Sequence, residues 1–81
     1  MEKEKEIFLK NVSTELKVLR VSNNDTQEEL SRKSGVATST ISKYETSTDN
    51  LNLDKIQEII EPYNITLSIF FKRVIAKTQN S

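Results

Sequence analysis

The chain has 81 residues, enough for one small domain that buries only about 60% of its unfolded surface on folding. Its 12 basic and 12 acidic side chains cancel, which argues against a protein that coats nucleic acid through charge alone. Without cysteine or histidine, disulfides are excluded, zinc loses its usual ligands and Ser-His or Cys-His catalysis cannot be assembled. We therefore expect no enzyme, no metal or other cofactor, and no small-molecule ligand. The lack of a signal peptide or long apolar run favours a cytoplasmic protein without membrane contact.

The N-terminal part of the chain predicts one long helix. Residues 1–5 alternate glutamate and lysine, as expected of a solvated helix start without a function of its own. From about Glu6 to Val21, buried positions recur every three or four residues, at Phe8, Val12, Leu16 and Leu19. This spacing is the signature of an amphipathic helix with one apolar stripe. The polar residues 22–25 then predict a turn.

The stretch from Thr26 to Glu45 predicts two short helices joined by a tight turn. Thr26 and, three residues later, Glu29 form a capping box, in which each side chain accepts a hydrogen bond from the other's backbone amide. The only glycine of the chain, Gly35, is expected to take a positive φ and to end the first helix.

The second helix of this pair predicts a polar reading surface. Val36, Ile41 and Tyr44 form its apolar spine. The side chains between them can all form hydrogen bonds and none is acidic: Thr38, Ser39, Thr40, Ser42 and Lys43. The sequence therefore favours a surface that recognises a polar partner.

The remainder of the chain predicts a loop and two more helices. Residues 46–52 lack apolar spacing, and Asn52 is expected to cap a fourth helix that ends before Pro62. The expected core face of this helix is Leu53, Ile56, Ile59 and Ile60. Thr66 can cap a fifth helix running to about Ala76, and its apolar residues spread beyond one stripe. That excess favours a contact with a second subunit.

The segment from Thr26 to Glu45 resembles the helix-turn-helix of the Cro/CI/Xre family of DNA-binding regulators. The matching residues are Thr26-Gln27-Glu28-Glu29-Leu30-Ser31, then Gly35-Val36, and finally Ile41, Tyr44 and Glu45. The resemblance implies an all-α fold, a compact five-helix lambda-repressor-like domain spanning residues 1–81. The family usually caps its recognition helix with serine or threonine where this chain has Ala37, so either that cap is missing or Thr38 caps a helix that starts one residue later.

The same resemblance assigns roles to individual residues. It implies base contacts in the major groove from Thr38, Ser39 and Lys43. It implies contacts to the DNA backbone from Thr26, Gln27, Thr46 and Asn50. It also implies a structural ion pair between Arg20 and Glu45.

A narrower resemblance concerns the fifth helix, at about residues 66–76. The sequence TLSIFFKRVIAK and the long first helix resemble the corresponding parts of the small controller proteins of restriction-modification systems, which dimerise through this region. It implies a homodimer on a pseudo-palindromic operator of double-stranded DNA, with RNA polymerase as a further candidate partner. The expected dimer interface is Ile69, Phe70, Phe71 and Ile75.

Several alternatives stay open at this point. The helix pair can be an ordinary part of a small bundle, or a protein-binding module that modulates another regulator without binding DNA, which zero net charge favours slightly. Both apolar faces of the fifth helix can be buried within one subunit. Three basic residues, Lys72, Arg73 and Lys77, are expected to form a solvated tail, and nothing is expected to gather around Asp25, Asp49 or Asp54.

Overall fold

Five α-helices and one short 3₁₀ helix make up the part of the protein that the structure, a computed structural model, describes, residues 2–80. The elements are α1 (Glu2–Ser22), α2 (Gln27–Ser34), α3 (Thr38–Thr46), α4 (Leu53–Ile60), the 3₁₀ helix η1 (Glu61–Tyr63) and α5 (Leu67–Gln79). The prediction of an all-α, five-helix fold is confirmed, since these described elements include no strand.

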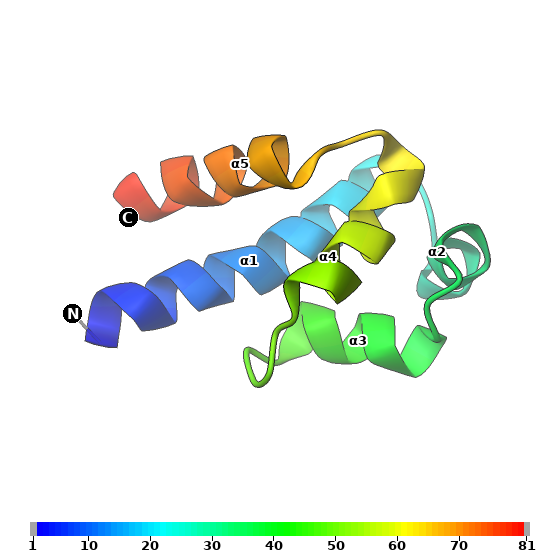
Figure 1. The fold of residues 1–81 in the computed structure, drawn as a ribbon, viewed down its shortest axis with the longest axis horizontal. Coiled ribbons are helices and arrows are strands. Elements are labelled where there is room, and N and C mark those ends of the chain that lie inside the picture. Colours follow the sequence, from blue (N-terminus) through cyan, green and yellow to red (C-terminus); the bar gives the residue numbers. More distant parts are fainter. Residues whose placement is uncertain (1, 81) are drawn as a thin grey trace.

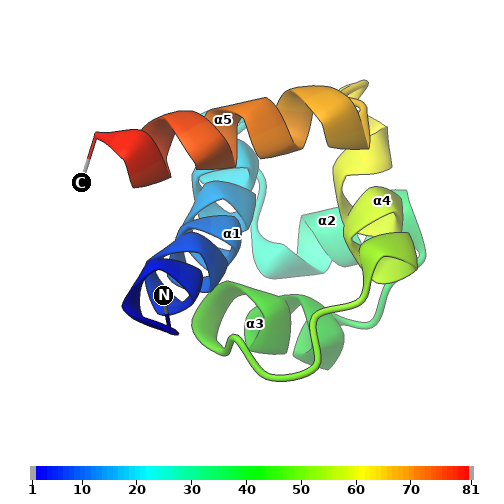
Figure 2. The same cartoon turned by 60° about the vertical axis from the view of Figure 1, so that its left-hand side comes forward.

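The long helix α1 forms the centre of this arrangement. In Figure 1, α5 lies along one side of α1 and α3 along the other, and Figure 2 shows α2 and α4 completing the bundle beyond α1. The beginning of α1 and the end of α5 lie at the same end of the molecule (Figure 1). The helix α3 lies on the opposite side of α1 from α5, and α2 lies near the far end of α1 (Figure 1).

The boundaries of α2 follow from the predicted local signals. Thr26 Oγ1 accepts the Glu29 amide at 3.1 Å, and Glu29 Oε1 accepts the Thr26 amide at 2.9 Å, so the capping box is confirmed. Gly35 ends the helix at φ +76°, and its amide donates to the Ser31 carbonyl. A Cβ atom added at position 35 would meet nothing within 4 Å, so the backbone conformation, not space, selects glycine over alanine here.

The helix α3 starts without a side-chain cap. Its N-cap residue is Ala37, which forms no capping hydrogen bond, and Thr38 is already helical. The alternative start with Thr38 as the cap is therefore wrong. The helix also continues to Thr46, which shortens the following loop to residues 47–52. Asn52 caps α4 as predicted, accepting the Lys55 amide at 3.0 Å.

The hydrophobic core lies where all five helices meet. It consists of Val12, Leu16, Leu19, Leu30, Val36, Ile41, Tyr44, Ile56, Ile59, Ile60, Phe70 and Val74. Two predictions need correction. Leu53 is 58% exposed because it lies in the first turn of α4, ahead of the part that packs on the core. Phe70 is expected in the dimer interface, but it is completely buried, so its side chain fills the core and cannot contact a second subunit.

Ion pairs between α1 and α5 replace the predicted solvated tail. The side chain of Glu15 on α1 is only 4% exposed, and Lys77 Nζ lies 2.9 Å from its Oε1. Arg73 Nη1 lies 3.8 Å from the other oxygen, so both cations belong to a contact between helices. Because an unpaired buried carboxylate is costly, these cations offset the burial of Glu15. Lys72 is exposed, as predicted.

No helix in the described part of the chain is long and apolar enough to cross a membrane.

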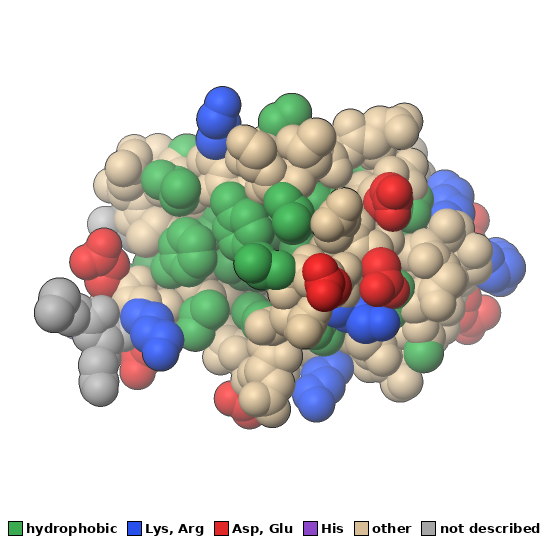
Figure 3. Space-filling model, in the orientation of Figure 1, with side chains coloured by type: hydrophobic (Ala, Val, Ile, Leu, Met, Phe, Trp, Pro, Cys, Tyr) green, Lys and Arg blue, Asp and Glu red, His purple; other side chains and the backbone are tan. Residues whose placement is uncertain are grey.

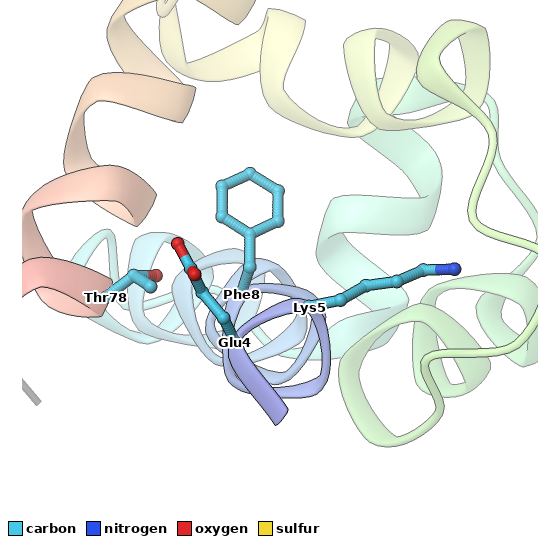
Figure 4. Close-up of a pocket in the computed structure, with 4 residues that line it drawn as sticks. All are labelled: Glu4, Lys5, Phe8 and Thr78. Carbon is cyan, nitrogen blue, oxygen red and sulfur yellow. The ribbon is translucent and has the colours of Figure 1, made fainter. Parts of the chain in front are cut away.

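A pocket of about 290 Å³ lies between the first turns of α1 and the end of α5, lined by Glu4, Lys5, Phe8 and Thr78 (Figure 4). It lies far along α1 from the turn that joins α2 to α3 (Figure 1).

Candidate nucleic-acid interface

The helix-turn-helix is built by burying one face of α2 and α3. Leu30 of α2 and Ile41 of α3 are fully buried, and Val36 fills the turn between them. Because these apolar residues all point into the core, the polar residues of α3 are left on the outside. In Figure 1, α3 forms the edge of the molecule opposite α5.

The residues expected to read bases lie on this outer side of α3. Ser39 and Lys43 are exposed and one helical turn apart, so they share a face, while Thr38 is half-buried in the first turn. The first turn of α3 carries no acidic residue. The outer surface of α3 therefore offers hydroxyl groups and one ammonium group to a partner rich in hydrogen-bonding groups.

The residues expected at the DNA backbone lie around the two ends of α2 and α3. Thr26 is exposed at the start of α2, and Thr46 is exposed at the end of α3, where its Oγ1 donates to the Ser42 carbonyl at 2.8 Å. Asn50 is exposed in the following loop at φ +57°. Gln27 is half-buried and donates from Nε2 to Glu45 Oε1 at 3.1 Å, so the start of α2 lies beside the last turn of α3.

Arg20 and Glu45 form an ion pair beneath this surface. Arg20 Nε lies 2.7 Å from Glu45 Oε2, and Arg20 Nη2 lies 3.0 Å from Oε1, a bidentate arrangement. The two side chains are 11% and 3% exposed. The hydrogen bond to Glu45 raises the pKa of Arg20 above its usual range, so the guanidinium stays charged. The pair fixes α3 to the end of α1.

A second polar cluster surrounds Asp25, in the turn between α1 and α2. Its carboxylate accepts Lys33 Nζ at 2.9 Å on both oxygens and the Tyr63 hydroxyl at 2.7 Å. Arg20 Nη1 donates to the Asp25 carbonyl at 2.7 Å, which joins this cluster to the ion pair. The prediction that nothing gathers around Asp25 is wrong, because Lys33 and Tyr63 reach it from 8 and 38 residues away. No local pattern in the sequence signals a contact of that length.

The protonation of the Asp25 cluster follows from its contacts. The hydrogen bond from Lys33, with the one from Tyr63, lowers the pKa of the Asp25 carboxyl below its usual range. Burial, reinforced by the bond to Asp25, raises the pKa of the Tyr63 phenol. At neutral pH the carboxyl is therefore ionised and the phenol keeps its proton, which is the donor that the bond requires.

The fold and this outward polar face define a helix-turn-helix DNA-binding domain. Residues 16–70 match the model of the helix-turn-helix family HTH_3, which is of the Cro/CI/Xre type. The chain belongs to this family and is a DNA-binding regulator.

The controller resemblance is supported by solved structures. A point mutant of the Restriction-Modification Controller Protein C.Esp1396I is 27% identical with a TM-score of 0.82, over 90% of this chain and 97% of that chain. Two further mutants of the same protein match at the same identity, with TM-scores of 0.82 and 0.79. No curated protein sequence matches the chain. Among solved structures, then, the chain is similar to a controller protein along almost its whole length.

Proposed function

We propose that the chain binds a pseudo-palindromic operator as a homodimer and regulates transcription as restriction-modification controller proteins do. The observation that carries this proposal is the polar, non-acidic outer face of α3, held on a buried ion pair. RNA polymerase is the further partner through which bound protein would change transcription.

The proposed contacts fall into two groups with different consequences. Thr38, Ser39 and Lys43 read base edges in the major groove, where a lysine suits guanine O6 and N7 and a hydroxyl can donate or accept. The second group is Thr26, Gln27, Thr46 and Asn50, which meet phosphates near the positive end of the α2 dipole. Base contacts set the preferred sequence, and phosphate contacts set affinity for every sequence.

The decisive test selects bound duplexes from random DNA and then measures affinity for the selected operator. Lys43→Ala should cost about 1–3 kcal/mol on the operator and relax the preference at one base pair in each half-site. Lys10→Ala is the matched control, because Lys10 is exposed on α1 and belongs neither to the proposed DNA contacts nor to the proposed dimer interface. If Lys43→Ala left both affinity and the selected motif unchanged, the assignment of α3 as the reading helix would be wrong.

The proposed dimer forms through α5, with Ile69, Phe71 and Ile75 as its interface and without the buried Phe70. Ile69 and Ile75 are each 45% exposed, unusual for isoleucine. The Phe71 ring stacks on Phe8 of α1 with centroids 6.2 Å apart, and apolar side chains gather where these helices lie side by side (Figure 3). A two-fold contact would set the reading helices about one DNA turn apart, roughly 34 Å.

Sedimentation tests the dimer independently of the base contacts. We expect a dimer at micromolar concentration, and a dimer on the operator. A chain that stays monomeric in both states would refute this part of the proposal while leaving the reading helix untouched.

One observation favours a second candidate, a module that binds another regulator through α5 and has lost DNA affinity. The zero net charge gives the chain little non-specific attraction to DNA. A salt-sensitive, sequence-dependent shift with DNA fragments excludes this candidate, and its absence favours it.

A further inference from the structure

Asp25 is the most completely held residue of the turn between α1 and α2. Its amide donates to the Arg20 carbonyl at 3.2 Å, and its carbonyl accepts Arg20 Nη1 at 2.7 Å. Its carboxylate, 5% exposed, accepts Lys33 and the Tyr63 hydroxyl. The backbone and the side chain of Asp25 are therefore both fixed by hydrogen bonds.

Asp25 lies just before the start of α2. The next two residues are Thr26 and Gln27, the N-cap and the first residue of α2, which are the proposed phosphate contacts. The N-terminal amides of a helix point along its axis, so a small shift at Asp25 moves the whole phosphate-binding end of α2. Among the side chains that form hydrogen bonds with Asp25, that of Tyr63 is the farthest away along the chain, because Tyr63 belongs to η1, between α4 and α5.

We propose that Tyr63 is a positioning residue for DNA binding, which holds the phosphate-contacting end of α2 in its bound orientation through Asp25. This inference rests on the proposed function. A bond that is already formed in the free protein removes an ordering cost from binding, so its loss weakens the complex even when the domain stays folded. Because the phosphate contacts carry no sequence information, the loss is the same for every duplex.

The experiment measures the affinity of the full chain for two fluorescent duplexes, the selected operator and an unrelated sequence. Tyr63→Phe removes only the hydroxyl, and Lys33 still pairs with Asp25, so the variant keeps its buried charge neutralised. We expect roughly three- to tenfold weaker binding to both duplexes, the value of one hydrogen bond. All measurements are made at a temperature where melting curves show every variant fully folded.

A double-mutant cycle separates positioning from general stability. A Thr26→Ala, Gln27→Ala background removes the side-chain phosphate contacts at the start of α2, so Tyr63→Phe should cause a clearly smaller further loss of affinity there than in the wild type. The matched control is Asn11→Ala, which also removes a part-buried hydrogen bond between two elements, 3.0 Å from Asn11 Nδ2 to Thr78 Oγ1. It should lower the melting temperature and leave DNA affinity unchanged.

The outcomes are distinct. Equal losses on both duplexes that shrink in the Thr26→Ala, Gln27→Ala background support the positioning role. Unchanged affinity of Tyr63→Phe, or an equal loss in both backgrounds, overturns it while the proposed function stands. A wild-type chain that binds neither duplex overturns the proposed function, and the positioning role falls with it.

Discussion

Arg20 shows how much of this domain depends on the shape of one side chain. Its guanidinium donates three hydrogen bonds, two to the Glu45 carboxylate and one to the Asp25 carbonyl. These bonds join α1, the turn before α2, and α3 at one point. Lysine has the same charge but no planar fork, so it cannot form the same set of bonds.

Removing the Arg20 side chain should therefore lower the stability of the domain. Arg20→Ala leaves the Glu45 carboxylate buried with Gln27 as its remaining donor, and we expect a loss of about 3 kcal/mol in the free energy of unfolding. Lys17→Ala, at an exposed position on the same helix, should change it by under about 0.5 kcal/mol. Chemical denaturation of both variants checks this, and equal effects would mean that the ion pair contributes nothing.

Asp25 gives the domain a defined response to acid. Its folded pKa lies below its unfolded value, so its contribution to stability is present above the unfolded value of about 3.9 and is lost as the pH falls through the folded value. The melting temperatures of wild type and Asp25→Asn should differ by a constant amount from neutral pH down to about pH 5 and converge below about pH 4.

This comparison isolates Asp25 from other carboxyl groups. The capping contacts with Thr26 also lower the pKa of Glu29, so both chains should lose some stability in acid. Only the difference between the chains reports Asp25. A difference that stayed constant down to the lowest pH would contradict the lowered pKa.

Among the four helices α2 to α5, whose starts lie within the described residues, α3 is the one that begins without a side-chain cap. Its N-cap is Ala37, which provides no hydrogen-bond acceptor for the free amides of the first turn. Ala37→Ser should add that acceptor and raise the free energy of unfolding by about 1 kcal/mol. Ala76→Ser, at an exposed position inside α5, should instead lower it slightly, by about 0.5 kcal/mol or less. Thermal melts distinguish the two, and a decrease for both would show that the start of α3 has no room for a cap.

The sequence predicts contacts between residues that are near each other in the chain, and it does not predict contacts between distant residues. The capping box of Thr26 and Glu29 and the turn at Gly35 involve residues within a few positions, so their patterns are visible in the sequence. The contacts of Glu15 with Arg73 and Lys77 join the two end helices. Charge alone does not say which carboxylate a distant cation will meet, so this contact could not be predicted.

The surface roles of apolar residues were equally hard to assign. Periodicity places Phe70 and Ile69 together in an apolar helix, but it does not say which side another helix covers. In the folded chain Phe70 is fully buried and Ile69 is 45% exposed. That distinction depends on how α5 packs on α1 and α4, which is a property of the tertiary structure.

At the scale of the whole molecule, stability and assembly should be linked. A domain of this size buries a small core, so the proposed partner subunit would add a large share of its stability. If the proposed dimer forms, the melting temperature should rise with protein concentration, because only the folded state associates. Differential scanning fluorimetry across a wide dilution series measures this dependence.

Two variants test whether α5 is responsible. Ile75→Asp should flatten the concentration dependence by placing a charge in the proposed interface. Val21→Asp introduces the same charge at another exposed apolar position, on α1, and should leave the slope unchanged. A melting temperature that does not depend on concentration in the wild type would indicate a domain that is stable as a monomer.

The conformation of Gly35 has a consequence for the handedness of the residue at that position. Its φ of +76° is unfavourable for L-residues and favourable for their mirror images. A D-alanine placed there by chemical synthesis should fit the native backbone while restricting the unfolded chain, which should raise stability by about 0.4–1 kcal/mol. L-alanine at the same position should lower it. Position 35 thus has a preferred chirality that the ribosome cannot supply, and glycine, the achiral residue, is the nearest choice available to translation.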